Sequence, residues 1–218
     1  MTPEIVTMTV NGQTWTAWER VMIRASFKEA ARSFEMTIAA ERGGAQTAAM
    51  FAIFAPVEIR AGGDLVIAGF IDKRAPSFDA TSASMSISGR SKGADAVDTS
   101  ARHKTGSFKK KKPDEIAKEI APKSVTFSCD LNLDAVDYQL TPGESVFGAI
   151  EKLARAQGAT LSGQADGSIK ITNASKSAKK HAGGLFEGVN IKSGSANPDG
   201  SSRPSDYRVV GQAAKGTG

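Results

Sequence analysis

The sequence has little of what most metal and redox centres need. It contains one cysteine, Cys129, and two histidines, His103 and His181, among 218 residues. A single cysteine cannot form an internal disulfide or a cysteine-rich zinc cluster, and two histidines exclude a histidine-rich metal site. We therefore expect no cofactor and no metal, and we interpret Cys129 as a small buried hydrophobic residue.

Long apolar runs are also missing. The most apolar stretch, residues 48–57, is too short to cross a bilayer and is interrupted by Pro56. The sequence does not open with the charged and then apolar leader of a secreted protein, so we expect neither a signal peptide nor a membrane span. The net charge of +5 allows an acidic partner without requiring one.

What the first half of the chain does contain is a series of short strands joined by tight turns. Asn11 and Gly12 tolerate the positive φ of a two-residue hairpin turn, and Trp15 and Trp18 follow as large core or interface anchors. Residues 45–55, after a break at 43–44, fit either a short helix or a packed loop. Apolar and polar residues alternate, as in half-buried strands, over residues 6–10, 21–25, 34–40, 57–59, 65–71 and 83–89. Local strands of this kind predict an antiparallel barrel or sandwich.

Helical patterns enter after about residue 92. Residues 94–97 predict one helical turn, and Pro113 with the following acids predicts a helix that Pro122 stops. A capping box formed by Thr141 and Glu144 predicts a longer helix that ends at Gly158. The remaining elements are expected as a short strand at 125–127, a hairpin whose turn is 165–167, and a strand at 206–210.

One motif suggests catalysis. Residues 89–93, Gly-Arg-Ser-Lys-Gly, match the G-x-S-x-G nucleophile elbow and place Ser91 between a predicted strand and a helical turn. An elbow needs a parallel sheet, whereas these strands are hairpin-connected, and His103 follows Ser91 too closely for the usual order of a triad. His181 lies in a basic, polar segment. We therefore favour a structural turn and expect no catalytic, cofactor-binding or metal-binding residues.

Charged residues give two weaker indications. The run Lys109, Lys110, Lys111 and Lys112 could neutralise phosphates or meet an acidic protein, but a solvated face beside a helix start is the commoner meaning of such a run. The helical carboxylates have no spacing that identifies a glycosidase pair: Glu115, Glu119, Glu144 and Glu151.

A longer series of motifs resembles a known family. It comprises residues 68–80, residues 86–101 with their Gly-Arg-Ser-Lys turn, the Val-Asn-Gly opening at 10–12, the helix entry at 140–147 and the closing stretch 205–212. In order and spacing these resemble the baseplate hub protein of Mu-like contractile-tailed bacteriophages, the late control D or tail hub superfamily. Ala96 and Thr99 stand where that family usually has leucine and cysteine.

The resemblance implies a β-rich α+β fold, in which an antiparallel barrel-like domain carries an inserted small α/β domain. Residues 1–98 and 184–212 would form the discontinuous barrel, and residues 99–183 the inserted lobe. Residues 213–218 would be a flexible tail. The family's second barrel is expected to be missing from this chain, either because the chain is a truncated piece or because it is a shortened hub that completes its ring otherwise.

The resemblance also implies a non-enzymatic role. The expected protein is a homotrimer in the virion tail baseplate, present in the host cytoplasm during assembly, which joins the central spike to the tail tube or its initiator. Its further neighbours would be wedge proteins and DNA passing transiently through its lumen.

The alternatives are a cell-wall or ester hydrolase that uses Ser91, and a host-surface carbohydrate-binding module, which joint exposure of Trp15 and Trp18 would favour. The sequence does not distinguish a phage from a phage-derived particle.

Overall fold

The structure is a computed structural model that describes most of the chain. The described residues are 5–27, 29–39, 49–80, 82–173, 184, 186–191, 193–195, 197, 201, 206 and 208. The chain divides into a compact unit, Met1–Ala178, and a second unit, Lys179–Gly218. In the second unit the described residues include one bridge, between Glu187 and Ile191. The predictions for 43–44, His181 and 213–218 lie outside the described residues, as does most of the predicted strand at 206–210.

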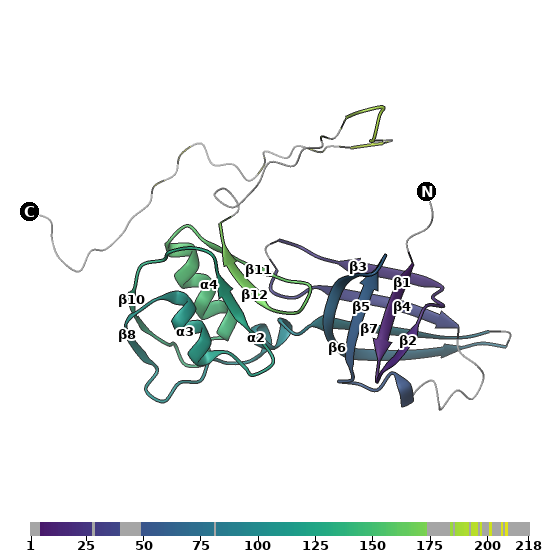
Figure 1. Cartoon of the computed structure of the whole chain (residues 1–218), viewed down its shortest axis with the longest axis horizontal. Helices are drawn as coiled ribbons and strands as arrows, with labels where there is room; N and C mark the ends of the chain where they lie inside the picture. Colours follow the sequence, from purple (N-terminus) through teal and green to yellow (C-terminus); the bar gives the residue numbers. More distant parts are fainter. Residues whose placement is uncertain are drawn as a thin grey trace, which may run out of the picture. The chain divides into compact units, whose positions relative to one another are not determined.

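The first unit begins with a curled antiparallel sheet of seven strands, which we call the sheet domain (Figure 1). Its spatial order is β2-β1-β5-β6-β7-β4-β3. The strands are β1 Val6–Val10, β2 Gln13–Trp15, β3 Arg20–Arg24, β4 Ser33–Ala39, β5 Pro56–Ala61, β6 Asp64–Phe78 and β7 Ala83–Ser91. Each of these strands corresponds to a segment of alternating residues or to the returning arm of the Asn11–Gly12 hairpin.

The alternating pattern has the predicted physical cause. In β7, Met85 and Ile87 are buried on one face while the intervening serines are half-buried on the other. Asn11 and Gly12 have φ values of 49° and 78°, which confirms the two-residue hairpin turn between β1 and β2. The described part of the ambiguous 45–55 segment starts as a helical turn at residues 49–50 and continues as a loop.

Apolar side chains from one face of the sheet form the core of this domain. Trp15 packs on Phe51 with ring centroids 5.2 Å apart, and Trp18 donates its indole N–H to the carbonyl of Val6 at 3.1 Å. The buried members of the core are Met8, Val10, Phe34, Met36, Ile38, Phe51, Ala55, Val57, Ile59, Ile67, Ile71, Met85 and Ile87.

The second part of the first unit is a small α/β lobe, residues 94–173. Its elements are α2 Ala94–Asp98, β8 Ser107–Lys111, α3 Pro113–Ile120, β9 Phe127–Cys129, β10 Val136–Gln139, α4 Val146–Ala156, β11 Thr160–Gly163 and β12 Ile169–Thr172. β8 pairs with β10, whereas β12 pairs antiparallel with β11 and parallel with β9. Sequence reasoning missed β8 and β10 and found the other elements.

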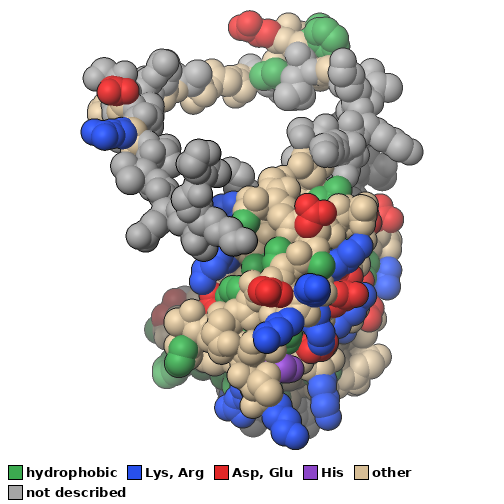
Figure 2. Space-filling view, turned by 90° about the vertical axis from the view of Figure 1, so that its left-hand side faces the viewer, with side chains coloured by type: hydrophobic (Ala, Val, Ile, Leu, Met, Phe, Trp, Pro, Cys, Tyr) green, Lys and Arg blue, Asp and Glu red, His purple; other side chains and the backbone are tan. Residues whose placement is uncertain are grey.

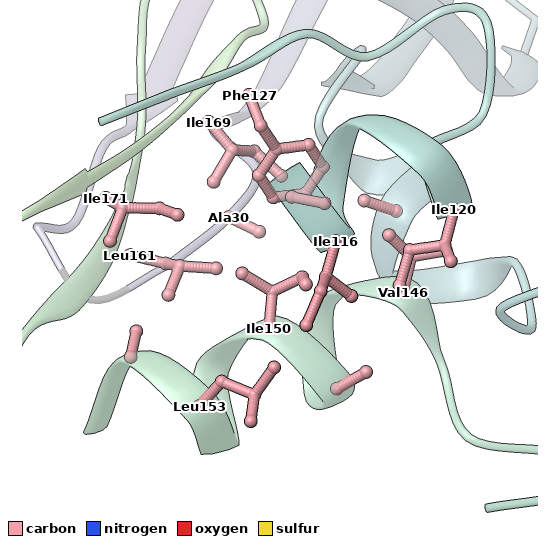
Figure 3. Close-up of a cluster of buried hydrophobic side chains, with 14 of the residues drawn as sticks. Ala30, Ile116, Ile120, Phe127, Val146, Ile150, Leu153, Leu161, Ile169 and Ile171 are labelled. Atoms are coloured by element: carbon pink, nitrogen blue, oxygen red, sulfur yellow. The ribbon is translucent and has the colours of Figure 1, made fainter. Parts of the chain in front are cut away.

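The lobe has its own core between the two longer helices and the three-stranded sheet. Figure 3 shows Ile116 from α3, Ile150 and Leu153 from α4, and residues of β11 and β12 directed toward one another. Ala30 belongs to the same cluster although it comes from the loop between β3 and β4 of the sheet domain. This core therefore includes a residue from the other part of the unit.

The helix ends follow the predicted chemistry with one exception. Pro113 is the first residue of α3. α4 ends with the C-cap residue Gln157, and the next residue, Gly158, has a φ of 70°. The N-cap of α4 is Ser145, whose hydroxyl accepts the Gly148 N–H at 3.1 Å, so the predicted Thr141 cap is wrong. The Glu144 carboxylate does accept the Thr141 N–H at 3.2 Å, but this bond closes the turn before the helix.

The structure is thus a β-rich α+β fold, as expected, with a curled antiparallel sheet and a small α/β lobe. Among the described residues, no helix has both the length and the apolar character needed to span a bilayer. The return of residues 184–212 into the sheet domain remains a prediction, because most of that segment lies outside the described residues.

Candidate assembly site and the joint between sheet and lobe

The loop between β3 and β4 inserts into the α/β lobe. Ala30, at its centre, is 4% exposed, and the carbonyl of Glu29 accepts the Gly163 N–H at 3.0 Å. A Cβ atom at either Gly93 or Gly163 would lie 2.3 Å from the carbonyl oxygen of Ala30. Both positions therefore need glycine, because any side chain would force the two main chains apart.

A second connection runs from β6 to the hairpin between β11 and β12. The Ala68 N–H donates to the carbonyl of Ala165 at 2.7 Å, and the Lys92 N–H donates to the carbonyl of Ala68 at 3.0 Å. Gly167, with φ 85°, lies in the same hairpin turn, where a Cβ would approach the Ala68 oxygen to 2.9 Å. Main-chain bonds from two loops thus join the sheet domain to the lobe.

The G-x-S-x-G motif is part of this joint. Ser91 is 1% exposed, its hydroxyl accepts the Arg32 N–H at 3.0 Å, and its own N–H donates to the Arg32 carbonyl at 2.9 Å. β7 is antiparallel to both neighbours, β6 and β4, so the strand does not end at the top of a parallel sheet. Gly89 is required because a Cβ there would lie 2.0 Å from the Phe70 carbonyl.

In the described part of the chain, the other side chains considered for catalysis make contacts of their own. The ring of His103 lies 4.4 Å from that of Phe108, and its Nε2 lies 3.5 Å from a carboxylate oxygen of Glu119. Glu115 accepts the Lys112 N–H at 2.8 Å, and Glu151 pairs with Arg155. Cys129 is partly buried, with its Sγ 3.3 Å from the Leu131 carbonyl. The geometry of Ser91 supports a structural turn rather than a nucleophile.

Arg90, the second residue of the motif, links three elements. Its guanidinium donates to both carboxylate oxygens of Asp98 on α2, at 3.3 and 2.8 Å, and its Nε donates to Asp72 on β6 at 2.7 Å. The hydrogen bonds to Asp98 and then to Asp72 raise the pKa of Arg90 above its ordinary value, against the opposing effect of burial. Arg90 therefore stays charged and holds the strand-to-helix turn against β6.

The curled sheet has unpaired edges among its described strands. β2 and β3 are its two terminal strands and each pairs with one neighbour. The pairing of β6 with β5 ends at Phe70, and Ile71 still bonds to the main chain of Phe54 and Ala55, whereas the pairing of β6 with β7 continues to Phe78. Open edges of this kind are sites where another strand can add.

Large apolar side chains are exposed on the same domain. Phe78, at the end of β6, is 85% exposed, and Phe54, in the loop before β5, is 78% exposed. Phe54 also has a φ of 66°, a conformation that is costly for a bulky residue with a Cβ. Met22 on the edge strand β3 is 47% exposed. These residues are candidates for contact with another chain.

The two tryptophans do not form an exposed pair. Trp15 and Trp18 are each partly buried and pack against the core of the sheet domain. A carbohydrate platform needs exposed aromatic faces, so the observation that would have favoured a carbohydrate-binding module is not met.

The lysine run lies on strand β8 and ends at the N-cap of α3. Phe108 of β8 is buried, whereas Lys109 and Lys110 are exposed. The Lys111 ammonium pairs with Glu119 and lies 5.8 Å from the centroid of the Phe108 ring, and Lys112 donates to the Asn132 amide oxygen at 2.8 Å. Figure 2 shows basic side chains gathered at the lower end of this face of the molecule, near a histidine.

Comparison with family models finds two adjacent matches. Residues 5–91 match the N-terminal domain of Mu phage baseplate assembly protein GpP-like, and residues 93–173 match the second domain of baseplate hub protein gp44-like. The boundary between these matches falls within the Ser91–Gly93 turn. The sheet domain therefore corresponds to the first matched domain and the lobe to the second.

Individual relatives agree with these matches. The chain is 28% identical over 215 residues to the baseplate hub protein gp44 of Escherichia phage Mu, covering 95% of this chain and 55% of the relative. The 43 kDa tail protein of prophage MuSo2 from Shewanella oneidensis has a similar structure, with a TM-score of 0.71, 24% identity, and 80% of this chain and 56% of that chain covered. A tail protein from Neisseria meningitidis also has a similar structure, with a TM-score of 0.64 and 24% identity. The match covers 78% of this chain and 50% of that chain. The chain thus spans about half the length of these proteins.

Proposed function

The chain belongs to the family of Mu-like phage baseplate hub proteins, and from this premise we propose that it acts as a homotrimeric adaptor joining the central spike to the tail tube. A baseplate hub is a structural protein of the virion tail and not an enzyme. The observation that carries the proposal is the pair of successive domain matches over residues 5–91 and 93–173.

The open edges of the sheet support assembly with sister copies. An unpaired strand exposes main-chain donors and acceptors, and closed rings remove such edges by pairing them between subunits. β3 is a suitable edge because its exposed Met22 could become buried when a neighbouring subunit packs there. The exposed Phe54 and Phe78 supply further apolar area for the same purpose.

The domain organisation is part of the same proposal. We propose that residues 1–98 and 184–212 form the barrel-like domain, that residues 99–183 form an inserted segment containing the lobe without α2, and that residues 213–218 form a tail. The described sheet ends at β2 and β3, so a returning segment would add at one of these edges and a sister copy at the other. The proposed partners are the spike, the tube or its initiator and the wedge proteins. DNA crosses the lumen transiently, and assembly takes place in the host cytoplasm.

Sedimentation velocity of the purified chain, alone and with its spike protein, tests the trimer. We expect a species of three times the monomer mass that binds the spike. Met22→Lys, which places a charge on the β3 edge, should weaken the trimer, whereas Ala156→Lys, which adds the same charge on the exposed end of α4, should leave it intact. A chain that stays monomeric at micromolar concentration and ignores the spike would overturn the proposal.

A further inference from the structure

β8 contains a local bulge that turns two neighbouring lysines outward. In a regular strand Lys110 would face the same side as Phe108, which is the buried side. Between the paired positions Val136↔Lys111 and Tyr138↔Phe108, β8 has two residues where β10 has one, and Lys110 has a φ of 51°. The extra residue re-aims the chain, so that Lys109 and Lys110 are both exposed.

The bulge is held in place by Asp137. Its carboxylate accepts the Lys110 N–H at 2.7 Å from the opposite strand, which fixes the left-handed residue. Glycine or asparagine would adopt this conformation at lower cost than lysine. A lysine at the one strained position of β8 therefore suggests that its exposed charge is used.

The lysines along and just after β8 differ in whether their ammonium groups have a partner. Among the described residues, the ammonium groups of Lys109 and Lys110 have no hydrogen-bond or ion-pair partner, whereas Lys111 pairs with Glu119 and Lys112 with Asn132. We call the four residues Lys109, Lys110, Lys111 and Lys112 the lysine strip. Its first two members are available to a ligand.

The strip is interrupted by carboxylates. Asp137 of β10 accepts the Lys110 N–H, and on α3 Glu115 accepts the Lys112 N–H while Glu119 pairs with Lys111. Duplex DNA would bring its phosphates close to these acids, which would repel it. Phe108 is 2% exposed, so the strip also offers no ring on which a single-stranded base could stack.

We propose that the lysine strip docks an extended acidic segment of a partner protein. In an extended chain every second side chain faces the same side, so one face of a narrow peptide with alternating acids could bring carboxylates to Lys109 and Lys110 without the width of a DNA duplex. This docking surface is independent of the proposed trimer, because it lies on the lobe and not on the open edges of the sheet.

Fluorescence anisotropy with the full chain tests the proposal. The probes are a labelled peptide of about ten residues that alternates glutamate and serine, the same peptide with glutamine in place of glutamate, and a labelled DNA duplex of about the same length. At physiological salt we expect the acidic peptide to bind more tightly than either of the others. The double variant K109Q/K110Q should weaken its binding by about three- to tenfold, the size expected for two exposed ion pairs.

A matched control removes the same charge elsewhere. The double variant R60Q/K73Q changes two exposed cations of the sheet domain and should bind the acidic peptide as the unaltered chain does. Thermal unfolding of each variant shows whether its fold is intact, and K110G serves as a second variant because glycine suits the left-handed position. The proposal is overturned if the acidic peptide does not bind, if R60Q/K73Q weakens it as much as K109Q/K110Q, or if the duplex binds more tightly than the peptide.

Discussion

The hydroxyl of Ser91 accepts the main-chain N–H of Arg32 at 3.0 Å, and this bond connects the last residue of β7 to the loop that enters the lobe. Ser91→Ala leaves that N–H without a hydrogen-bond partner next to a buried side chain. We therefore expect the free energy of unfolding to fall by about 1.5 kcal/mol. Urea denaturation measures this. Ser88→Ala on the half-exposed face of the same strand should change the stability by less than about 0.5 kcal/mol. Loss of an esterase activity in Ser91→Ala would contradict the structural role.

The close approach of Ala30 to the lobe makes a second prediction. Gly93→Ala places a Cβ 2.3 Å from the Ala30 carbonyl oxygen, a main-chain atom that cannot rotate away. We expect a loss of about 2–3 kcal/mol in stability, because the joint must open to admit the methyl group. Thermal unfolding measures the loss, with the exposed Ala156→Ser as control. An unfolding temperature equal to that of the unaltered chain would show that the loop is not fixed by this contact.

The sheet domain could be predicted from the sequence because its strands are half-buried. Alternation gives β7 and its neighbours directly, and Asn11–Gly12 fixes the first hairpin. The family resemblance rested on motifs in both the sheet domain and the lobe, and the two domain matches confirm it.

The joint and the lysine strip could not be predicted, for physical reasons. Ala30 is a small loop residue whose role depends on a contact with Gly93 and Gly163, far along the chain. β8 was missed because its sequence, Ser-Phe-Lys-Lys-Lys, has one apolar residue and therefore no alternating pattern, and its bulge at Lys110 depends on the partner strand. Residues 89–93 match a catalytic motif for a structural reason. Gly89 and Gly93 are needed for close packing of main chains, and their spacing around Ser91 is also that of a nucleophile elbow.

Glu144 gives a pH-dependent prediction. Burial alone would raise the pKa of Glu144, but hydrogen bonds from Lys152 at 2.7 Å and Tyr138 at 2.6 Å, with the Thr141 N–H, lower it below its ordinary value. A lowered pKa in the folded state favours folding above the unfolded pKa of about 4.3, and this stabilisation is lost as pH falls through the folded value.

Glu144→Gln should therefore reduce stability at pH 7 by about 1–2 kcal/mol, and the difference from the unaltered chain should shrink in acid. Urea titrations from neutral pH down to about pH 3 measure the two curves. Glu151→Gln, which removes the exposed i,i+4 pair with Arg155, should give a difference below about 0.5 kcal/mol. Parallel curves for Glu144→Gln and the unaltered chain would mean that Glu144 keeps its ordinary pKa.

A variant of Phe54 distinguishes a role in folding from a role in assembly. Its side chain is 78% exposed and its φ is 66°, so the folded subunit gains little from the ring and bears the cost of the left-handed conformation. Phe54→Asn, which tolerates that conformation, should leave the free energy of unfolding unchanged or raise it by up to about 1 kcal/mol. If Phe54 is an assembly contact, as we propose, the same variant should dissociate the trimer at lower dilution in sedimentation velocity. A less stable subunit with unchanged assembly would instead show that Phe54 contributes to folding and not to the trimer contact.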